Sequence, residues 1–231
     1  MPPTKRSNKV IIFCPGAPGM PQGGELGRFF VKKGYWFFAL RYRGSWESGG
    51  KFLRYSPEKD VYDVMNGLSR GFKSAWDGKK YRVKSSAIYL VGSSFGGPAA
   101  MLASRDSRVK AVIAISPVVD WRAPSKTESI DWTERFVKEA FNEAYRFKHK
   151  DWEKLKTGKF YNPATRVGKI DGKKIFIIHA KDDRVVSFGP VKKFAKQTGA
   201  TLITLPRGGH LSSSIVMKPA LWKKIRGFLK R

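Results

Sequence analysis

The chain has 231 residues, of which 41% are hydrophobic and 13% aromatic, and its formal net charge is +28. That hydrophobic content supports a folded core and excludes intrinsic disorder, which combines high net charge with low hydrophobicity. No apolar run approaches the roughly 18–20 residues of a membrane span, and a single cysteine, Cys14, excludes an internal disulfide. We therefore expect one domain over residues 1–231, in a reducing, cytoplasmic compartment.

Six short apolar runs predict the strands of a buried sheet. They are rich in Ile, Val, Phe and Tyr and lack the polar alternation of a half-exposed sheet. In chain order they are Val10–Phe13, Tyr35–Leu40, Ala87–Val91, Ala111–Ile115, Ile175–His179 and Thr201–Leu205.

Segments with helical character lie between and after these runs. They are Gly23–Lys33, Pro57–Trp76, Phe95–Ser104, Val186–Gln197 and Ser214–Lys230. Strands that alternate with helices indicate βαβ units, so we predict an α/β fold with a mostly parallel, doubly wound sheet.

One interval is too long for a simple crossover, since 59 residues separate the fourth and fifth runs. Within it, Asp131–Leu155 has helical spacing of its apolar residues. We expect a small helical cap insert, about residues 121–165, over the carboxyl edge of the sheet. The aromatic side chains of this insert either line a substrate pocket or form the core of the cap.

The third predicted strand leads directly into the sequence GSSFG, which fits the pattern G-x-S-x-G with Ser94 at its centre. A serine at a sharp turn from strand to helix has a strained backbone, and glycines two residues away on either side let neighbouring chain pass closely. Small residues follow, as at the start of a packed helix. The pattern predicts that Ser94 is a nucleophile.

A carboxylate and a histidine follow the last two predicted strands. Asp183 comes shortly after the fifth, and His210 follows two glycines after the sixth. A serine hydroxyl needs a base to accept its proton, and the imidazole needs a carboxylate to orient it. We therefore predict a triad of Ser94, Asp183 and His210, with Asp182 and Asp120 as alternatives for the acid.

On these motifs the chain resembles the α/β-hydrolase superfamily, in particular the catalytic domains of prolyl-oligopeptidase-like and dienelactone-hydrolase-like serine hydrolases. The stretches that carry the resemblance are CPGAPG, RYRGSWESGG, VGSSFGG, ISPVVDW, IIHAKDDRVV and GGH. The resemblance implies the α/β-hydrolase fold and favours Asp183 as the acid. Members commonly read HG-x-x-D-x-x-V, with the acid four residues after a histidine that corresponds to His179.

Acyl transfer also needs hydrogen-bond donors for the oxyanion. The backbone N–H of Phe95, directly after the nucleophile, is one expected donor. The resemblance places the second in the loop after the first strand, where Pro18 has no N–H to donate and Ala17 does. Related peptidases can supply a tyrosine hydroxyl there. Ala17 cannot, which favours an esterase.

The predicted function is therefore that of a serine hydrolase that cleaves carboxylic esters through an acyl-enzyme intermediate. A peptidase or a thioesterase with the same triad is the alternative, so the expected partner is a small ester or a short peptide. The sequence predicts neither a metal nor a cofactor, because three isolated histidines and one cysteine lack ligand spacing. It does not predict which residues bind the substrate.

The predicted chemistry does not explain the positive charge of the chain. The sequence contains 46 Lys and Arg residues but only 18 Asp and Glu residues. The charges are spread along the chain rather than gathered in one tract. They form either a generally basic solvated surface or a contact for polyanions, and both predict salt-dependent, non-specific binding to nucleic acid. A non-catalytic polyanion-binding protein of the same fold is the alternative from another class.

Overall fold

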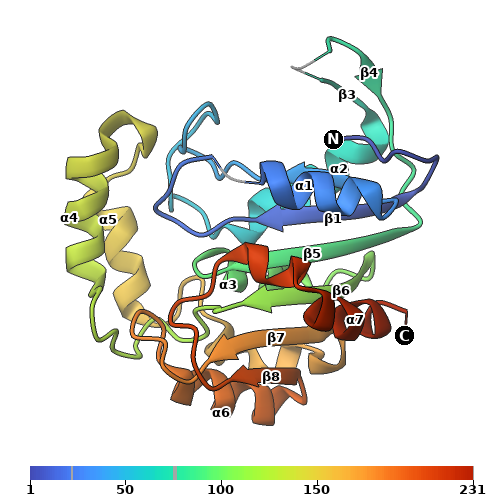
Figure 1. The fold of residues 1–231 in the computed structure, drawn as a ribbon. Helices are drawn as coiled ribbons and strands as arrows, with labels where there is room; N and C mark the ends of the chain where they lie inside the picture. Colours follow the sequence, from blue (N-terminus) through green and yellow to red (C-terminus); the bar gives the residue numbers. More distant parts are fainter. Residues whose placement is uncertain (22, 75–76, 231) are drawn as a thin grey trace.

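The computed structural model describes residues 1–21, 23–74 and 77–230. Its centre is a parallel sheet of six strands in the order β2-β1-β5-β6-β7-β8 (Figure 1). All six predicted strands are confirmed. Their bounds are β1 (Lys9–Cys14), β2 (Trp36–Ala39), β5 (Ala87–Ser93), β6 (Val109–Ile115), β7 (Ile175–Ala180) and β8 (Thr201–Leu205).

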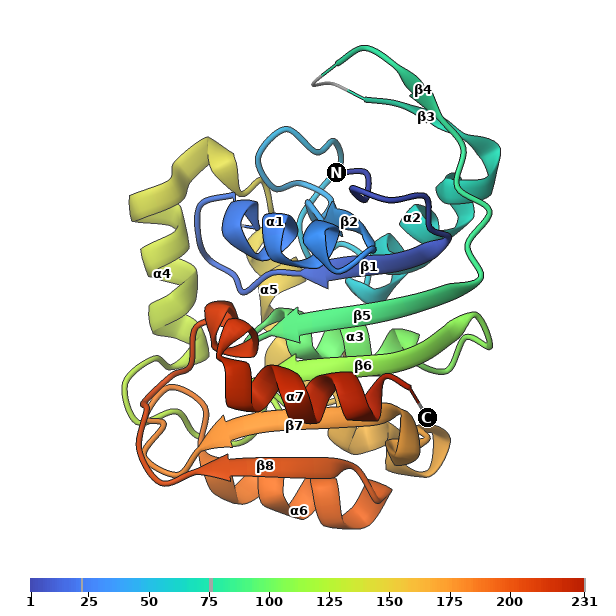
Figure 2. The same ribbon diagram turned by 45° about the vertical axis from the view of Figure 1, so that its right-hand side comes forward.

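Helices cover both faces of the sheet, which confirms the doubly wound α/β fold (Figure 2). On one face, α1 (Gly24–Lys32) and α7 (Pro219–Phe228) pack over one apolar cluster. On the other face, α2 (Glu58–Arg70), α3 (Gly96–Ala103) and α6 (Phe188–Thr198) pack over a second, larger cluster. The strands are buried on both sides, which explains why their sequences are continuously apolar.

The prediction of a helix over Pro57–Trp76 is wrong in its last part. The helix ends at Arg70, because Gly71 takes a φ of 98°. A short antiparallel hairpin of β3 (Phe72–Lys73) and β4 (Lys80–Tyr81) follows, in which the rings of Phe72 and Tyr81 stack. Ala75 and Trp76, the last two residues of the predicted helix, lie outside the described residues.

The insert between β6 and β7 is helical but more broken than expected. It contains α4 (Ile130–Phe141), η1 (Asn142–Ala144), α5 (His149–Trp152), η2 (Glu153–Thr157) and η3 (Pro163–Lys169), and η4 (Gly172–Lys174) leads into β7. In Figure 1 the strand arrows point towards α4 and α5, so the insert lies at the carboxyl edge of the sheet. The predicted closing helix is also divided, into η5 (Ser213–Met217) and α7, which begins at Pro219.

No helix within the described ranges is both long enough and apolar enough to cross a membrane.

Candidate active site

A strained serine stands between β5 and α3. Ser94 has a φ of 50°, a left-handed conformation that costs a non-glycine residue about 1–2 kcal/mol. Its N–H donates to the Ile115 carbonyl oxygen at 2.9 Å, and its own carbonyl oxygen accepts from Gly97 N–H and Val118 N–H. These three hydrogen bonds hold the turn in place. The residue lines a cavity at the carboxyl edge of the sheet.

The two glycines of the motif are required by close backbone approach. A Cβ on Gly92 would lie 2.5 Å from the Gly96 carbonyl oxygen, and a Cβ on Gly96 would overlap the Cys14 carbonyl oxygen on β1. The pattern G-x-S-x-G therefore has a steric basis in this chain. A side chain at either position would force α3 away from the sheet.

The predicted acid and base are in contact. His210 Nδ1 lies 2.9 Å from Asp183 Oδ2, and the N–H groups of Val185 and Val186 both donate to Asp183 Oδ1 at 2.9 Å. Burial acts to raise the pKa of Asp183, but the hydrogen bonds from His210 and from Val186 N–H outweigh it, so the pKa lies below its ordinary value. Asp183 is therefore a buried, ionised partner that fixes the orientation of the imidazole.

The other two carboxylates have different partners. Asp182 accepts hydrogen bonds from the N–H groups of Gly208, at 3.2 Å, and Gly209, at 2.9 Å. Asp120 is paired with the guanidinium of Arg122 and accepts a hydrogen bond from Asn162. Among the contacts of the described residues, Asp183 is the carboxylate that reaches His210.

The nucleophile turn and the histidine loop are fixed at consecutive residues. Ser94 N–H donates to the carbonyl oxygen of Ile115, the last residue of β6, and Leu211 N–H donates to Ser116 Oγ at 3.1 Å. Because Ile115 and Ser116 are neighbours, the turn with Ser94 and the loop with His210 are fixed beside each other. Sequence reasoning gave Ser116 no role, although it lies in the stretch ISPVVDW that carries part of the family resemblance.

His179, at the end of β7, supports the acid loop. Its side chain is buried, and its Nε2 donates to the Val186 carbonyl oxygen at 2.9 Å. The same nitrogen lies 3.5 Å from Asp183 Oδ2. Burial lowers the pKa of His179, so it holds the loop as a neutral hydrogen-bond donor.

His149 lies in the cap, in a group whose ligand atoms are all within 4.8 Å of one another: Glu134, His149 and Glu153. Its Nδ1 is 2.9 Å from Glu134 Oε1. Lys138 and Lys156 already pair with the two carboxylates, each at 2.7 Å. The two lysines balance the negative charges of Glu134 and Glu153 without a metal ion. We therefore interpret this group as an ion-pair network that joins α4 to α5.

The loop expected to carry the second oxyanion donor packs against the nucleophile turn. Tyr42 Oη donates to the Pro15 carbonyl oxygen at 2.9 Å, and a Cβ on Gly16 would lie 3.4 Å from the Cβ of Ser94. Ala17 lines the same cavity as Ser94. The loop is therefore held against the Ser94 turn by a tyrosine that sequence reasoning did not single out.

The other expected donor, the N–H of Phe95, lies at the start of α3. The Phe95 carbonyl oxygen accepts a hydrogen bond from Tyr161 Oη, which in turn accepts one from Ala99 N–H at 3.1 Å. Tyr161 belongs to the insert, so the cap braces the peptide groups directly after Ser94. This tyrosine was also missed, because nothing near it in the chain indicates its distant partners.

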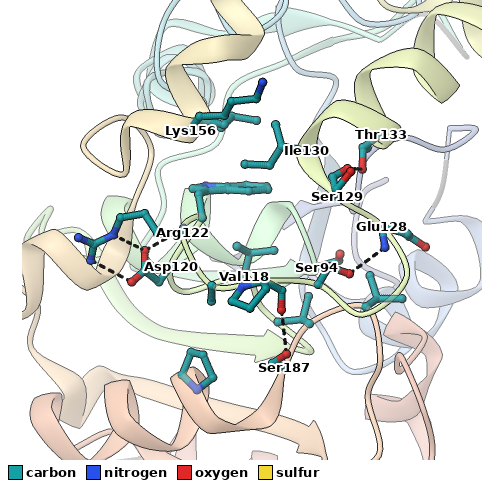
Figure 3. Close-up of a pocket in the computed structure, with 18 of the residues that line it drawn as sticks. Ser94, Val118, Asp120, Arg122, Glu128, Ser129, Ile130, Thr133, Lys156 and Ser187 are labelled. Carbon is teal, nitrogen blue, oxygen red and sulfur yellow. Dashed lines mark hydrogen bonds and ion pairs between the residues drawn. The ribbon is translucent and has the colours of Figure 1, made fainter.

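A cavity of about 350 Å³ opens above Ser94, between the sheet edge and the cap. Its apolar wall combines side chains from the segment after β6, the cap and the acid loop: Val118, Val119, Trp121, Ile130, Trp152, Leu155, Val185 and Val186. Figure 3 shows Ser94 and Val118 on one side and Ile130 and Lys156 on the other. Both tryptophan N–H groups are satisfied by backbone carbonyl oxygens. The tryptophans therefore contribute chiefly apolar surface to the cavity.

Of the aromatic side chains in the insert, Trp121 and Trp152 line the cavity, whereas Tyr145 is buried away from it. Trp132 and Phe136 stack on each other and are exposed. Both expectations for these aromatics are therefore met, by different residues.

The model of the prolyl oligopeptidase family matches residues 27–231, which is most of the chain. The chain belongs to the prolyl oligopeptidase family. The matched region contains Ser94, Asp183 and His210, while Ala17 lies outside it. A comparison with curated protein sequences finds no significant match.

Solved structures share the fold of this prolyl oligopeptidase family member. The Pyrococcus furiosus esterase Pf2001 is similar with a TM-score of 0.67 and 22% identity, over 97% of this chain and 82% of the esterase. The α/β hydrolase GrgF from Penicillium sp. sh18 has a TM-score of 0.70 and 16% identity, over 100% of this chain and 91% of GrgF. Est1E from Butyrivibrio proteoclasticus, solved with ferulic acid bound, has a TM-score of 0.68 and 19% identity, over 100% of this chain and 94% of Est1E. The family match makes the chain a hydrolase, and the likeness to these structures shows the α/β-hydrolase fold.

The two adjacent aspartates should differ in their effect on catalysis. Asp183→Ala removes the partner that orients His210 and should lower kcat by about 10³–10⁴-fold. Asp182→Ala frees only the N–H groups of two glycines before His210 and should lower kcat by about 10–100-fold, through misplacement of the loop. Steady-state hydrolysis of an activated ester measures both. An Asp182→Ala variant as impaired as Asp183→Ala would contradict the assignment.

The free energy of unfolding at low pH should also depend on the ionisation of Asp183. Its pKa in the folded protein lies below the ordinary aspartate value of 3.8, so its contribution to stability is present above that value and is lost as pH falls through the folded pKa. The difference in unfolding free energy between wild type and Asp183→Asn should therefore be constant above about pH 5 and shrink below pH 4. Urea unfolding between pH 2.5 and 6 measures it, and a difference that does not change with pH would exclude an ionised Asp183.

Proposed function

We propose that this chain is a serine hydrolase that cleaves carboxylic esters with small or medium apolar acyl or aryl groups. The observation that carries the proposal is the contact of buried Asp183 with His210, beside a strained Ser94 at the base of an apolar cavity. Such an arrangement suits acyl transfer, in which a base must take the serine proton as the oxygen attacks.

In the proposed reaction, Ser94 Oγ attacks the ester carbonyl carbon while His210 Nε2 accepts the hydroxyl proton. The negative oxygen of the tetrahedral intermediate binds to the N–H groups of Ala17 and Phe95. His210 then gives its proton to the departing alcohol, which leaves an acyl group on Ser94. Water, deprotonated by His210, attacks this acyl-enzyme and releases the carboxylic acid, and the proton returns to Ser94.

The cavity favours an apolar acyl or aryl group over a charged one. Two of the acidic residues that line it have cationic partners, because Asp120 pairs with Arg122 and Asp131 pairs with Lys156. The remaining wall near Ser94 is largely aliphatic and aromatic. A volume of about 350 Å³ lies at the low end of the range for small-molecule sites, which suits a compact ester.

A peptidase is the second candidate, because the chain belongs to the prolyl oligopeptidase family. A peptidase that trims short peptides needs an anchor for the charged terminus. Glu134, a buried acid of the cap, is engaged by Lys138 and His149. Glu128 lines the cavity, and its carboxylate could form an ion pair with the amino terminus of a peptide substrate. The esterase is preferred because Ala17 offers only a backbone N–H at the position where related peptidases can supply a tyrosine hydroxyl.

The test compares p-nitrophenyl esters of two-, four- and eight-carbon acids with a prolyl p-nitroanilide peptide. We expect hydrolysis of the esters, and a loss of kcat on the order of 10⁴–10⁶-fold in Ser94→Ala. The matched control is Ser93→Ala, which removes the neighbouring, buried serine hydroxyl and should keep activity within a few-fold. Faster turnover of the anilide would make the chain a peptidase. Equal activity in Ser94→Ala and wild type would refute the nucleophile.

A further inference from the structure

The positive charge is not evenly distributed along the chain. After Asp183 the sequence contains no acidic residue, although this part includes eleven Lys and Arg residues. It forms α6, β8 and α7, and the outer side of α7 carries exposed Lys223, Lys224 and Arg226. The excess charge therefore belongs to the sheet domain more than to the cap, where lysines pair with carboxylates on α4, α5 and η2.

A lysine-lined groove lies at the amino edge of the sheet. It has a volume of about 710 Å³, and its rim carries four lysine side chains: Lys110, Lys173, Lys174 and Lys230. They come from the start of β6, from η4 before β7, and from the end of the chain after α7. Figure 2 shows the end of α7 beside the amino ends of β6 and β7. Elements distant in sequence thus bring four cations to one hollow.

No carboxylate lines this groove within the described part of the chain. Two acids adjoin its elements in the chain: Asp106, whose carboxylate is held by Arg108 and feels the charge of Lys174, and Asp171, which caps the η4 turn. Neither forms an ion pair with the four rim lysines in the described structure. Four ammonium groups around one hollow that no carboxylate lines repel one another, and a bound polyanion would relieve that repulsion.

We propose that this groove binds the phosphodiester backbone of duplex nucleic acid without sequence preference. Lysine ammonium groups act as point charges for phosphates and carry no base-specific geometry. The aromatic residues of the groove, Tyr89 and Phe228, are 8% and 6% exposed, so they form its floor and offer no face for base stacking. Backbone contact is therefore the mode that this surface supports.

A basic hairpin precedes the groove-lining strand β5 in the chain. Lys79, Lys80, Arg82 and Lys84 are all exposed on β4 and the segment that leads into β5. That strand begins at Ala87, which lines the groove. A short run of chain therefore leads from the hairpin to the groove.

A membrane is a poorer partner for this surface. Peripheral binding to lipid combines basic residues with exposed apolar side chains that enter the bilayer. The large hydrophobic residues that are exposed in the described structure are Met1, Met20, Tyr55, Trp132 and Phe136. None of them lines the groove, and the stacked pair of Trp132 and Phe136 is on the cap at the other edge of the sheet.

The groove and the candidate active site are at opposite ends of the strands. Ser94 follows the carboxyl end of β5, whereas Ala87 begins that strand. A seven-residue strand spans roughly 20 Å. Nucleic acid in the groove should therefore leave hydrolysis of a small ester unchanged, so the two functions can be tested separately.

The experiment measures binding of a fluorescein-labelled 20-base-pair DNA duplex by anisotropy between 50 and 300 mM KCl. The test variant replaces Lys110, Lys173, Lys174 and Lys230 by Gln. The matched control replaces Lys148, Lys150, Lys159 and Lys192 by Gln, four exposed lysines outside the groove. Four lost phosphate contacts should make the slope of log K against log salt shallower by about 3–4 and weaken binding at 100 mM by at least about 100-fold. The control variant should stay within about threefold of wild type.

Equal weakening in both variants would overturn the proposal in favour of diffuse charge. So would a groove variant that binds DNA like wild type, or one that loses binding to phosphatidylserine vesicles only. Duplex RNA of the same sequence should bind like the DNA, because the backbone charge is shared. Thermal unfolding and ester hydrolysis of the groove variant should match wild type, which separates loss of binding from loss of fold and from failure of the proposed hydrolase function.

Discussion

The hydrogen bond from Ser94 N–H to the Ile115 carbonyl oxygen ties a strained turn to the centre of the sheet. Without it the serine would relax towards an ordinary conformation, since its left-handed backbone costs free energy. The close approach of Gly96 to Cys14 and Pro15 on the neighbouring strand then sets how near α3 and the oxyanion loop can come. Much of the candidate site follows from these backbone contacts. They are possible only because Gly92 and Gly96 have no side chain.

Around this turn, the acid and the base are held by loops that brace one another. Asp183 accepts from two backbone N–H groups and from His210, and Asp182 holds the two glycines before that histidine. Adjacent carboxylates thus have separate roles, one towards the imidazole and one towards the loop that carries it. The cap contributes through Tyr161, which fixes the peptide groups after Ser94. The cap therefore positions the site as well as covering it.

Local sequence constraints explain which features could be predicted. The six strands are continuous apolar runs, and the turn at Ser94 needs glycines at fixed spacing, so both leave short-range signals. The local sequence alone could not show whether Asp182 or Asp183 is the acid, because the direction of the backbone decides which of the two side chains meets His210. The resemblance to a family favoured Asp183. The ends of the cap helices depend on distant contacts, such as the bridge between Ser45 and Tyr145, and the braces from Tyr42 and Tyr161 have no local signal at all.

The two edges of the sheet differ in chemistry. The carboxyl edge has an apolar cavity in which several of the charged side chains are paired, as suits a reaction that develops charge away from water. The amino edge has lysines around a groove without acidic residues in the described structure. Parallel strands separate the two edges, so one fold can carry a compact reaction site and a broad electrostatic surface without mutual interference.

The central claim is that Ser94 is an activated nucleophile, and covalent labelling tests it most directly. Wild type and Ser94→Ala would be treated with a fluorophosphonate at neutral pH, and the adduct located by peptide mass spectrometry. We predict one adduct on Ser94, absent from the folded Ser94→Ala variant and formed much more slowly in Asp183→Asn. An unlabelled but folded wild type, or an adduct on Ser93 or another serine, would contradict it.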